Sequence, residues 1–431
     1  MPIFKRRFRQ ILLPPFHGPR SDKSAPPSPE PTLLAARNRL PAAPNGDTMS
    51  DTGQPGRHGD SGDMSRRTGS LKTLAKLFAV TSLTVGAAAP ADKTLIDYFL
   101  PMPIHGHLAA DAWGAPNVLP RDPQNGLEDT TIKQWCYWDG KIIKGPEGKY
   151  HMFASRWDQA RGHGGWGGSG AVHAVSDSPT GPYIDKGLCW PDNQGGRGHN
   201  VTALVLPDGR YAVVVSETRP GDVFVSKSLD GPWTQLGSIQ VDANGFEARD
   251  GRMSNVAMLV RPDGNYEIVA RSGAIMISTS GILGPYKLQG HSIYPGMPGL
   301  PTRNLEDPAI WFSGGLYHIV VNCWSDRKAF HLTSADGIDN WTNRGLAYDP
   351  TTDFVRYTDG TVNHWNNIER PGVYLENGHV AYFTFAVIDV PKAQELPNDN
   401  HGSKVIVVPF DGVAFDRAMQ SLSKAAPKKA N

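Results

Sequence analysis

Hydrophobic and polar positions follow a repeating pattern along the C-terminal three quarters of the chain. Short segments begin with glycine, reach an aromatic or apolar residue within two positions, and continue through mostly apolar, often β-branched residues. They are Gly148–Ser155, Gly209–Ser216, Gly264–Arg271, Gly315–Asn322 and a looser copy at Gly378–Phe385. The aligned aromatic residue falls at 150, 211, 266 and 317, in steps of 61, 55 and 51. Short apolar runs bounded by turn residues predict β-strands.

A second signature keeps the same phase downstream of each of the first four segments. Its copies are Ser176–Tyr183, Ser226–Trp233, and the weaker Ser278–Tyr286 and Thr333–Trp341. The closing aromatic recurs at 183, 233, 286 and 341, in steps of 50, 53 and 55. In the clearest copies a Gly-Pro pair sets a tight turn, and we expect the following ring to pack against the strands. A period near 50 residues predicts an all-β fold, a β-propeller.

Five blades are counted over about residues 100–415. Six or seven blades remain open, because residues 95–145 and 345–365 have room for further strands. The alternative is another all-β fold in which the turn motifs coincide by chance. A β-rich segment at 404–409 is expected to close the ring against the N-terminal segment, which would remove exposed sheet edges.

The first ninety residues lack this pattern. Residues 1–63 are rich in Pro, Arg, Ser and Gly, which predicts disorder or an over-extended start. Residues 64–89 combine a basic start, an apolar stretch and three alanines, which predicts an export signal peptide. The pair Arg66-Arg67 resembles a twin-arginine signal, with the Sec route or a membrane anchor as alternatives. We therefore expect a propeller domain over 95–415, a flexible tail over 416–431, and a periplasmic or secreted location.

Composition and charge limit the fold classes and binding partners to be expected. The 47 Gly and 36 Pro among 431 residues, with 20% charged residues, argue against a helical bundle or coiled coil. The net charge of +1 gives no general attraction to nucleic acid or to a membrane surface. The three cysteines form no CxxC pair, so no zinc motif is present. We expect no cofactor, with a structural metal ion left open, and a monomer.

Two histidines are candidates for acid–base chemistry. His151 lies in the first repeat strand and His173 in the next, so adjacent strands of one blade would bring them close. An imidazole titrates near neutral pH and can serve as base or acid. The alternative is that one or both are packing residues. The Gly-rich loop between them, residues 161–168, carries Trp166 as an aromatic platform.

Polar residues recur just before the first apolar strand of the later repeats. Since these positions share one phase, we expect them to face one pocket around the ring. The alternative is that they are turn or strand-entry residues, which Asn, Asp and Pro also favour. The residues are His199 and Asn200 in the second repeat, Asn255 in the third, Glu306 and Asp307 in the fourth, and Glu369 and Arg370 in the fifth.

Arginine and tryptophan side chains accompany these positions. Arginine binds a carboxylate with two parallel hydrogen bonds, so several inward arginines indicate an anionic ligand. Tryptophan offers a flat face to a sugar ring, although core packing also explains most of these residues. The candidate binding residues are Arg156, Trp157, Arg252, Arg271, Arg327 and Arg370.

These motifs, in this order, resemble the propeller carbohydrate-active enzymes. The resemblance rests on residues 139–157, Ser176–Tyr183, His199-Asn200, Glu306-Asp307-Pro308 and Glu369-Arg370-Pro371, and it covers about residues 100–415. The architecture is similar to glycoside hydrolase family 43. The nearer likeness is to lyases of rhamnose–glucuronate linkages, related to ulvan lyases.

The resemblance implies two alternative chemistries. In the lyases a histidine pair, matched here by His151 and His173, acts with an arginine that neutralises the uronate, for which Arg252 and Arg271 are the candidates. In the family 43 hydrolases three carboxylates act. Glu306, Asp307 and Glu369 are available here, and the early aspartate of that family has no partner beyond Asp139. This departure favours the lyase.

We therefore expect a secreted enzyme that cleaves a uronate-containing glycan by β-elimination. A glycoside hydrolase acting on the same class of glycan is the first alternative, and a sugar-binding propeller without catalysis is the second. The expected partner is an anionic oligosaccharide or polysaccharide.

Overall fold

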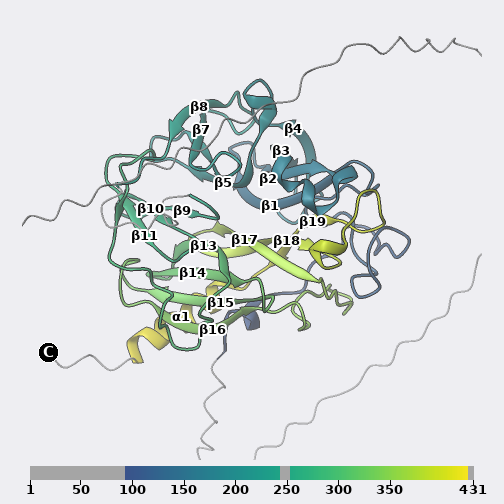
Figure 1. The fold of residues 1–431 in the computed structure, drawn as a ribbon. Helices are drawn as coiled ribbons and strands as arrows, with labels where there is room; N and C mark the ends of the chain where they lie inside the picture. Colours follow the sequence, from purple (N-terminus) through teal and green to yellow (C-terminus); the bar gives the residue numbers. More distant parts are fainter. Residues whose placement is uncertain (1–92, 243–252, 426–431) are drawn as a thin grey trace, which may run out of the picture. The chain divides into compact units, whose positions relative to one another are not determined.

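Five antiparallel sheets surround one axis in the computed structural model, which describes residues 93–242 and 253–425 (Figure 1). The predicted five-bladed β-propeller is confirmed. The expected disordered leader (1–63) and signal peptide (64–89) lie outside the described residues. No helix among the described residues has the length and apolar character needed to cross a membrane.

Each blade is an up-and-down sheet whose strands follow one another in the chain. The first blade has β1 (Trp135–Lys144), β2 (Tyr150–Asp158), β3 (Gly170–Ser176) and β4 (Ile184–Leu188). The second has β5 (His199–Val205), β6 (Tyr211–Glu217), β7 (Asp222–Ser226) and β8 (Thr234–Ser238). The third has β9 (Ala257–Val260), β10 (Tyr266–Val269), β11 (Ile275–Ser278) and β12 (Lys287–Leu288).

The last two blades complete the ring. The fourth has β13 (Leu305–Ser313), β14 (Leu316–Cys323), β15 (Lys328–Ser334) and β16 (Thr342–Tyr348). The fifth has β17 (Asn367–Glu376), β18 (His379–Ile388) and β19 (Ser403–Pro409). The 3₁₀ helices include Leu95–Tyr98, Gln159–Arg161, His163–Gly168, Gln194–Gly196 and Lys392–Gln394.

The first strand of each blade lies at the axis. β1 contacts both β5 and β17, and β13 contacts both β9 and β17, so the inner strands form a closed ring. Polar groups on these strands can therefore converge from all five blades.

The hydrophobic core lies between blades. Phe153 of the first blade packs with Val213 and Phe224 of the second, and similar clusters fill the other junctions. Both faces of the inner and middle strands are buried, which explains their nearly continuous apolar sequences.

The Gly-Pro-aromatic motif ends the third strand of a blade, as the sequence indicates. The hydroxyl of Tyr183 donates to the carbonyl of Pro179 over 2.9 Å, and the hydroxyl of Tyr286 donates to Ile282 over the same distance. Each ring thus closes its own turn while its face packs inward. This contact explains why an aromatic residue recurs at one phase.

The expected closing strand is present as β19. It pairs with β18, and isolated bridges join Val405 to Leu127 and Phe410 to Phe99. The N-terminal segment therefore covers the edge of the last blade.

The C-terminal segment differs from the expected flexible tail. Residues Gly412–Ala425 form a helix, α1, which begins before residue 416. Phe415 and Met419 are four residues apart, so they lie on one face of the helix and bury it against the last two blades.

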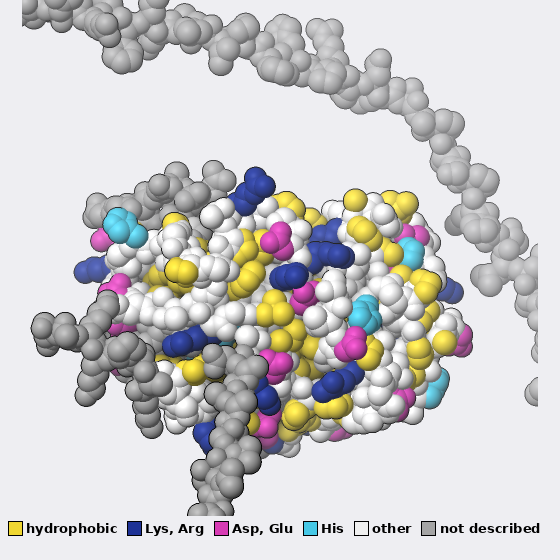
Figure 2. All heavy atoms as spheres, turned by 90° about the horizontal axis from the view of Figure 1, so that it is seen from below, with side chains coloured by type: hydrophobic (Ala, Val, Ile, Leu, Met, Phe, Trp, Pro, Cys, Tyr) yellow, Lys and Arg dark blue, Asp and Glu magenta, His cyan; other side chains and the backbone are white. Residues whose placement is uncertain are grey.

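The surface shows mixed charge. On the face drawn in Figure 2, acidic and basic side chains are interspersed and do not gather into one large patch. This distribution fits the net charge of +1.

Candidate active site

Five residues of the inner strands share an unusual backbone conformation. At one matching position, each inner strand or the residue pair just before it carries a non-glycine residue with a positive φ. They are Asp139 (68°), Asn200 (54°), Asn255 (47°), Asp307 (53°) and Arg370 (50°). Such strained backbone is uncommon outside glycine and clusters at functional sites. The ring therefore has a kink at one matching position in every blade.

The five kinked residues are joined by hydrogen bonds across blades. Arg370 Nε donates to Asp139 Oδ1 over 2.8 Å, and Arg370 Nη1 donates to Asp307 Oδ1 over 3.3 Å. Asn200 Nδ2 donates to Asn255 Oδ1. All five side chains are at most 8% exposed, so they form a fixed polar layer across the axis.

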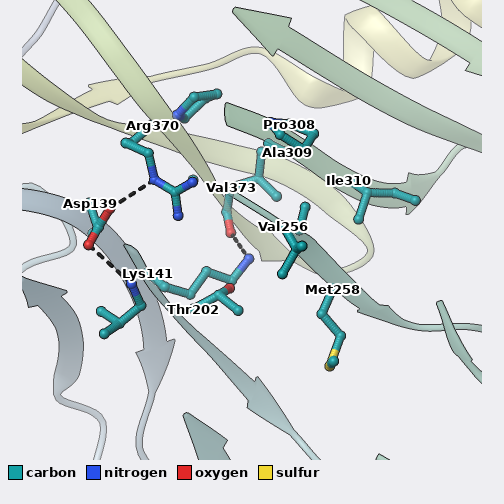
Figure 3. A pocket seen from close by; sticks show the side chains of 15 residues that line it. Asp139, Lys141, Thr202, Val256, Met258, Pro308, Ala309, Ile310, Arg370 and Val373 are labelled. Atoms are coloured by element: carbon teal, nitrogen blue, oxygen red, sulfur yellow. Dashed lines mark hydrogen bonds and ion pairs between the residues drawn. The ribbon is translucent and has the colours of Figure 1, made fainter. Parts of the chain in front are cut away.

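A narrow axial channel lies on one side of this layer (Figure 3). It has a volume of only about 40 Å³ and includes Lys141, whose Nζ donates to the carbonyl of Val373 over 2.8 Å. Burial lowers the pKa of Lys141 to about 8. Figure 3 shows the Arg370 guanidinium turned toward Asp139 at one end of this channel.

A wider pocket of about 250 Å³, here called the carboxylate pocket, adjoins the same layer. The kink lets the residue before each kinked position contribute to the pocket in four of the five blades. The pocket is lined by Trp138, Trp157, His163, Trp166, His199, Asn200, Glu217, Asn255, Arg271, Glu306, Asp307, Glu369, Arg370 and Lys392.

Three carboxyl groups meet in this pocket. Glu306, Asp307 and Glu369 each place an oxygen within 4.8 Å of the others. Desolvation, and then the charges of Asp307 and Glu369, raise the pKa of Glu306 to about 8. Burial likewise raises the pKa of Asp307, which Arg370 opposes. The pocket therefore holds a carboxyl group that is protonated at neutral pH.

Three cations of the chain face these carboxyl groups. Arg271 Nη2 lies 2.7 Å from Glu306 Oε2, Lys392 Nζ lies 2.5 Å from Glu369 Oε2, and Arg370 contacts Asp307. The spacing of the three carboxyl groups would suit a divalent cation. The side-chain cations already supply opposite charge at each carboxyl group.

Aromatic rings form one wall of the pocket. The rings of Trp138 and Trp157 lie 6.3 Å apart between centroids, and both meet the ring of His163 edge-on. Trp166 is 41% exposed and tilts over His199 at 5.1 Å. Trp138 and Trp157 are buried, and the exposed indole face of Trp166 beside polar groups suits a sugar ring.

Two further histidines contact this wall. His163 Nδ1 lies 3.0 Å from Oε2 of Glu395, whose carboxylate is fully buried, so the imidazole has a fixed orientation. His199 Nδ1 lies 2.9 Å from Ser169 Oγ, and burial lowers the pKa of His199 to about 4. His199 is therefore neutral at physiological pH.

The structure places His151 and His173 together but away from the carboxylate pocket. His151 Nδ1 lies 2.8 Å from His173 Nε2, and the pair ends at Glu147 on one side and Asp230 on the other. On β2, His151 stands six residues from Trp157 of the pocket wall, a distance of roughly 20 Å along an extended strand. Neither histidine lines the pocket.

The fourth blade contains a second copy of this histidine pair. His318 follows Tyr317 as His151 follows Tyr150, and its Nδ1 lies 3.0 Å from His331 Nε2. Both rings are fully buried beside Trp311. The repeat thus uses a histidine pair as interior packing. The sequence already indicates this, because Tyr-His occurs at the same position in the aligned segments of the first and fourth repeats.

The predicted binding residues divide between the pocket and other surfaces. Those brought together in the pocket are Trp157, His199, Asn200, Asn255, Arg271, Glu306, Asp307, Glu369 and Arg370. Arg156 stacks on Trp135 and pairs with Asp185 beside a separate cavity. Arg327 donates to the carbonyl of Asn366 over 3.2 Å and lies outside the pocket. Arg252 is outside the described residues.

Several pocket residues were not among the candidates from the sequence. His163, Glu217 and Lys392 come from loops or strand ends, and Glu395 lies behind the wall. The Gly-rich loop around His163 was the available signal. Loop residues far apart in sequence, such as 163 and 395, give no periodic pattern that would join them.

Comparisons with known proteins give neighbours by structure alone. No protein-family model matches the chain, and no curated protein matches it. A family 43 β-xylosidase/α-arabinofuranosidase from a compost microbial metagenome, in complex with xylotriose, shares 13% identity over 72% of this chain and 95% of its own, with a TM-score of 0.45.

Two other solved structures show a similar level of likeness. A family 117 glycoside hydrolase from the marine bacterium Zobellia galactanivorans shares 15% identity over 71% of this chain and 96% of its own, with a TM-score of 0.47. A putative exo-β-1,3-galactanase from Bifidobacterium bifidum shares 15% identity over 69% and 93%, with a TM-score of 0.43. Likeness at this level carries no statement about the activity of this chain.

Proposed function

We propose that the protein is a glycoside hydrolase, the first alternative from the sequence. The observation that carries this proposal is the meeting of Glu306, Asp307 and Glu369 within 4.8 Å in a pocket with a tryptophan wall. Hydrolysis of a glycosidic bond requires one protonated and one ionised carboxyl group. Paired carboxyl groups in unlike surroundings meet that requirement.

Glu306 suits the general acid. With its pKa raised to about 8, it carries a proton at neutral pH and can donate it to the leaving oxygen. Glu369 suits the second carboxylate, because Lys392 Nζ lies 2.5 Å from its Oε2 and supplies the opposite charge.

The short separation of the two groups favours retention of configuration. Retaining enzymes hold their carboxyl groups about 5 Å apart, whereas inverting enzymes leave roughly 6.5–9.5 Å for a water molecule. In this scheme Glu369 attacks the anomeric carbon as the bond to the leaving oxygen breaks, and Glu306 protonates that oxygen. Water then cleaves the glycosyl ester, with Glu306 accepting its proton.

Asp307 and Asp139 have positioning roles in this scheme. Asp139 accepts from Arg370, Ser155 and the backbone of Val201, so both of its oxygens are occupied. Arg370 in turn holds Asp307 beside the acid. Asp139 is therefore not free to act as a base while these bonds persist.

β-Elimination on a uronate is the second candidate, with His163 in place of the predicted histidine pair. Buried Glu395 orients His163, and the same pocket contains Arg271, which could neutralise a carboxylate. His151 and His173 remain the sequence-based candidates for this chemistry, but their distance from the pocket gives them no evident access to substrate.

One assay separates the two reactions. The protein is incubated with a panel of neutral and uronate-containing glycans, among them ulvan and rhamnose–glucuronate-rich arabinogalactan side chains. New reducing ends without ultraviolet absorbance of an unsaturated uronate support the hydrolase, and the appearance of that absorbance contradicts it. Glu306→Gln should lower kcat by about 10²–10⁴, since it removes the proton donor.

Stereochemistry tests the role of Glu369. Proton NMR of the first-formed product should show retention of the anomeric configuration. Inversion would contradict Glu369 as nucleophile and would point to Glu217, a further carboxylate that lines the pocket, as the base.

Export and a monomeric state also belong to this proposal. The signal-like composition of residues 64–89 supports export to the periplasm or the medium. Cell fractionation of chains with and without residues 64–89 tests it, and equal cytoplasmic retention of both would contradict it.

A further inference from the structure

A second cavity adjoins the carboxylate pocket. It has a volume of about 260 Å³ and is here called the arginine cavity, after Arg271 and Arg303, which line it with Tyr294, Pro295, Pro301 and Leu305. Its volume is similar to the 250 Å³ of the carboxylate pocket.

The two cavities meet at the proposed general acid. Leu305 lines the arginine cavity and Glu306, the next residue on β13, lines the carboxylate pocket. Successive residues of a strand point to opposite sides, so this part of β13 separates the two spaces. Arg271 lines both of them.

The arginine cavity has positive charge without an opposing carboxylate in its wall. Two arginines line it, and no acidic residue is among the described residues that line it. Arg271 is paired with Glu306, whereas Arg303 has no ion pair among the described residues. An exposed guanidinium beside apolar walls suits a carboxylate or sulfate on a sugar.

Tyr294 forms part of the cavity wall. Its side chain is 5% exposed, and its hydroxyl is closed to solvent and has no hydrogen-bond partner within the described part of the chain. Pro295 and Pro301 offer apolar surface to the C–H face of a ring.

On the basis of the proposed hydrolase, we propose that the arginine cavity binds the leaving sugar and that this sugar carries an anionic group, a carboxylate or a sulfate ester. The general acid must lie beside the leaving oxygen, and Glu306 lies at the junction of the two spaces. The other sugar then occupies the carboxylate pocket against the tryptophan wall.

Binding in the arginine cavity would also act on the proton of Glu306. Arg271 opposes protonation of Glu306 through its positive charge. An anionic group on Arg271 would offset that charge and favour the protonated acid. The fraction of enzyme with Glu306 protonated would therefore be larger with an anionic leaving sugar than with a neutral one.

Direct binding of monosaccharides tests the inference apart from catalysis. Titration calorimetry with glucuronate, glucose 6-sulfate and glucose is carried out on the wild type and on Arg303→Gln. The matched control is Arg417→Gln, an exposed arginine on α1 that lines neither cavity.

We expect one or both anionic sugars to bind at least about tenfold more tightly than glucose, because hydrogen bonds between charged groups are stronger than those between neutral groups. Arg303→Gln should remove that preference and Arg417→Gln should keep it. The tighter of the two anions identifies the group as carboxylate or sulfate. Equal affinity for glucose, or an unchanged preference in Arg303→Gln, would overturn the inference.

These measurements can overturn the proposed hydrolase and the proposed anion site independently of each other. Loss of the anion preference in Arg303→Gln, with the preference kept in Arg417→Gln, would support the cavity as an anion site. Unchanged binding together with normal hydrolysis would overturn the cavity alone. Specific anion binding without any hydrolysis would overturn the proposed reaction and leave the anion site standing.

Discussion

Arg370 of the last inner strand donates to Asp139 of the first over 2.8 Å, across 231 residues of sequence. Both side chains are almost fully buried, and Arg370 also reaches Asp307. This pair therefore joins the two ends of the ring and fixes the floor of the carboxylate pocket at the same time.

Removal of one partner from this pair should destabilise the fold. Arg370→Met leaves Asp139 buried without its counter-ion, and we expect a loss of about 3–5 kcal/mol in the free energy of unfolding. Denaturant unfolding measures this change. The control is Arg210→Met, which removes an exposed pair with Asp208 and should cost less than about 1 kcal/mol. Equal losses in the two variants would contradict the assigned role.

The activity should depend on the proton of Glu306. Because its pKa is raised to about 8, the acid is protonated below that pH and loses its proton above it. We expect kcat/KM to fall as the pH rises through about 8. A pH profile of the wild type measures this limb. A rate that increases through the same range would assign the essential proton donor elsewhere.

Glu306 should also make stability depend on pH. Its ordinary pKa is 4.5 and its folded pKa is about 8, so the folded state binds the proton more tightly. The stabilisation is fully present below 4.5 and is lost as the pH rises to about 8. Thermal unfolding of the wild type and Glu306→Gln at both ends of this range checks it. As the pH rises, the Tm of Glu306→Gln should increase relative to the Tm of the wild type.

The two histidine pairs should behave alike under substitution. His173→Ala and His331→Ala each remove the partner of the Nδ1 atom of a buried imidazole, in His151 and His318, so we expect a loss of stability in both with kcat changed less than about threefold. Burial already lowers the pKa of His173 to about 4, so it stays neutral at the working pH. Complete loss of turnover in His173→Ala, with the fold intact, would favour the lyase over the hydrolase.

Trp166 should contribute to substrate binding rather than to chemistry. Its indole is 41% exposed at the pocket and packs on His199. Trp166→Ala should raise KM by about two- to tenfold with little change in kcat, given a ring contact of about 0.5–1.5 kcal/mol. Trp324→Ala is the control, since Trp324 is 45% exposed and lines neither cavity. A matching change in KM there would contradict the assignment.

The fold could be predicted because each blade repeats its own turn chemistry. Tyr183 and Tyr286 close equivalent turns, and this contact requires an aromatic residue at the same position of each repeat. The requirement appears in the sequence as a regular spacing. The polar ring could be located for the same reason, since equal phase in a closed ring means equal height along the axis. Residues such as Asn255 and Glu369 thus meet in one pocket although they lie far apart in sequence.

The rest of the site depends on loops that have no period. His163 and Glu395 come from separate loops, and only the folded path of the chain brings them to 3.0 Å. Asp139 precedes Gly140 and looks like a hairpin turn in sequence, yet it is the kinked residue of its strand. The His151–His173 contact was expected from adjacent strands, but its place along β2 could not be read from strand adjacency alone.

The junction of Asp139 with Arg370 also sets the order in which the pocket can form. During synthesis the N-terminal blades emerge first, and a chain that ends before residue 369 lacks both Glu369 and the counter-ion of Asp139. Partial rings can bury their inter-blade clusters without having a complete pocket. Catalytic competence therefore arises in a single late step, and nascent or truncated chains should be inactive even where their blades are folded.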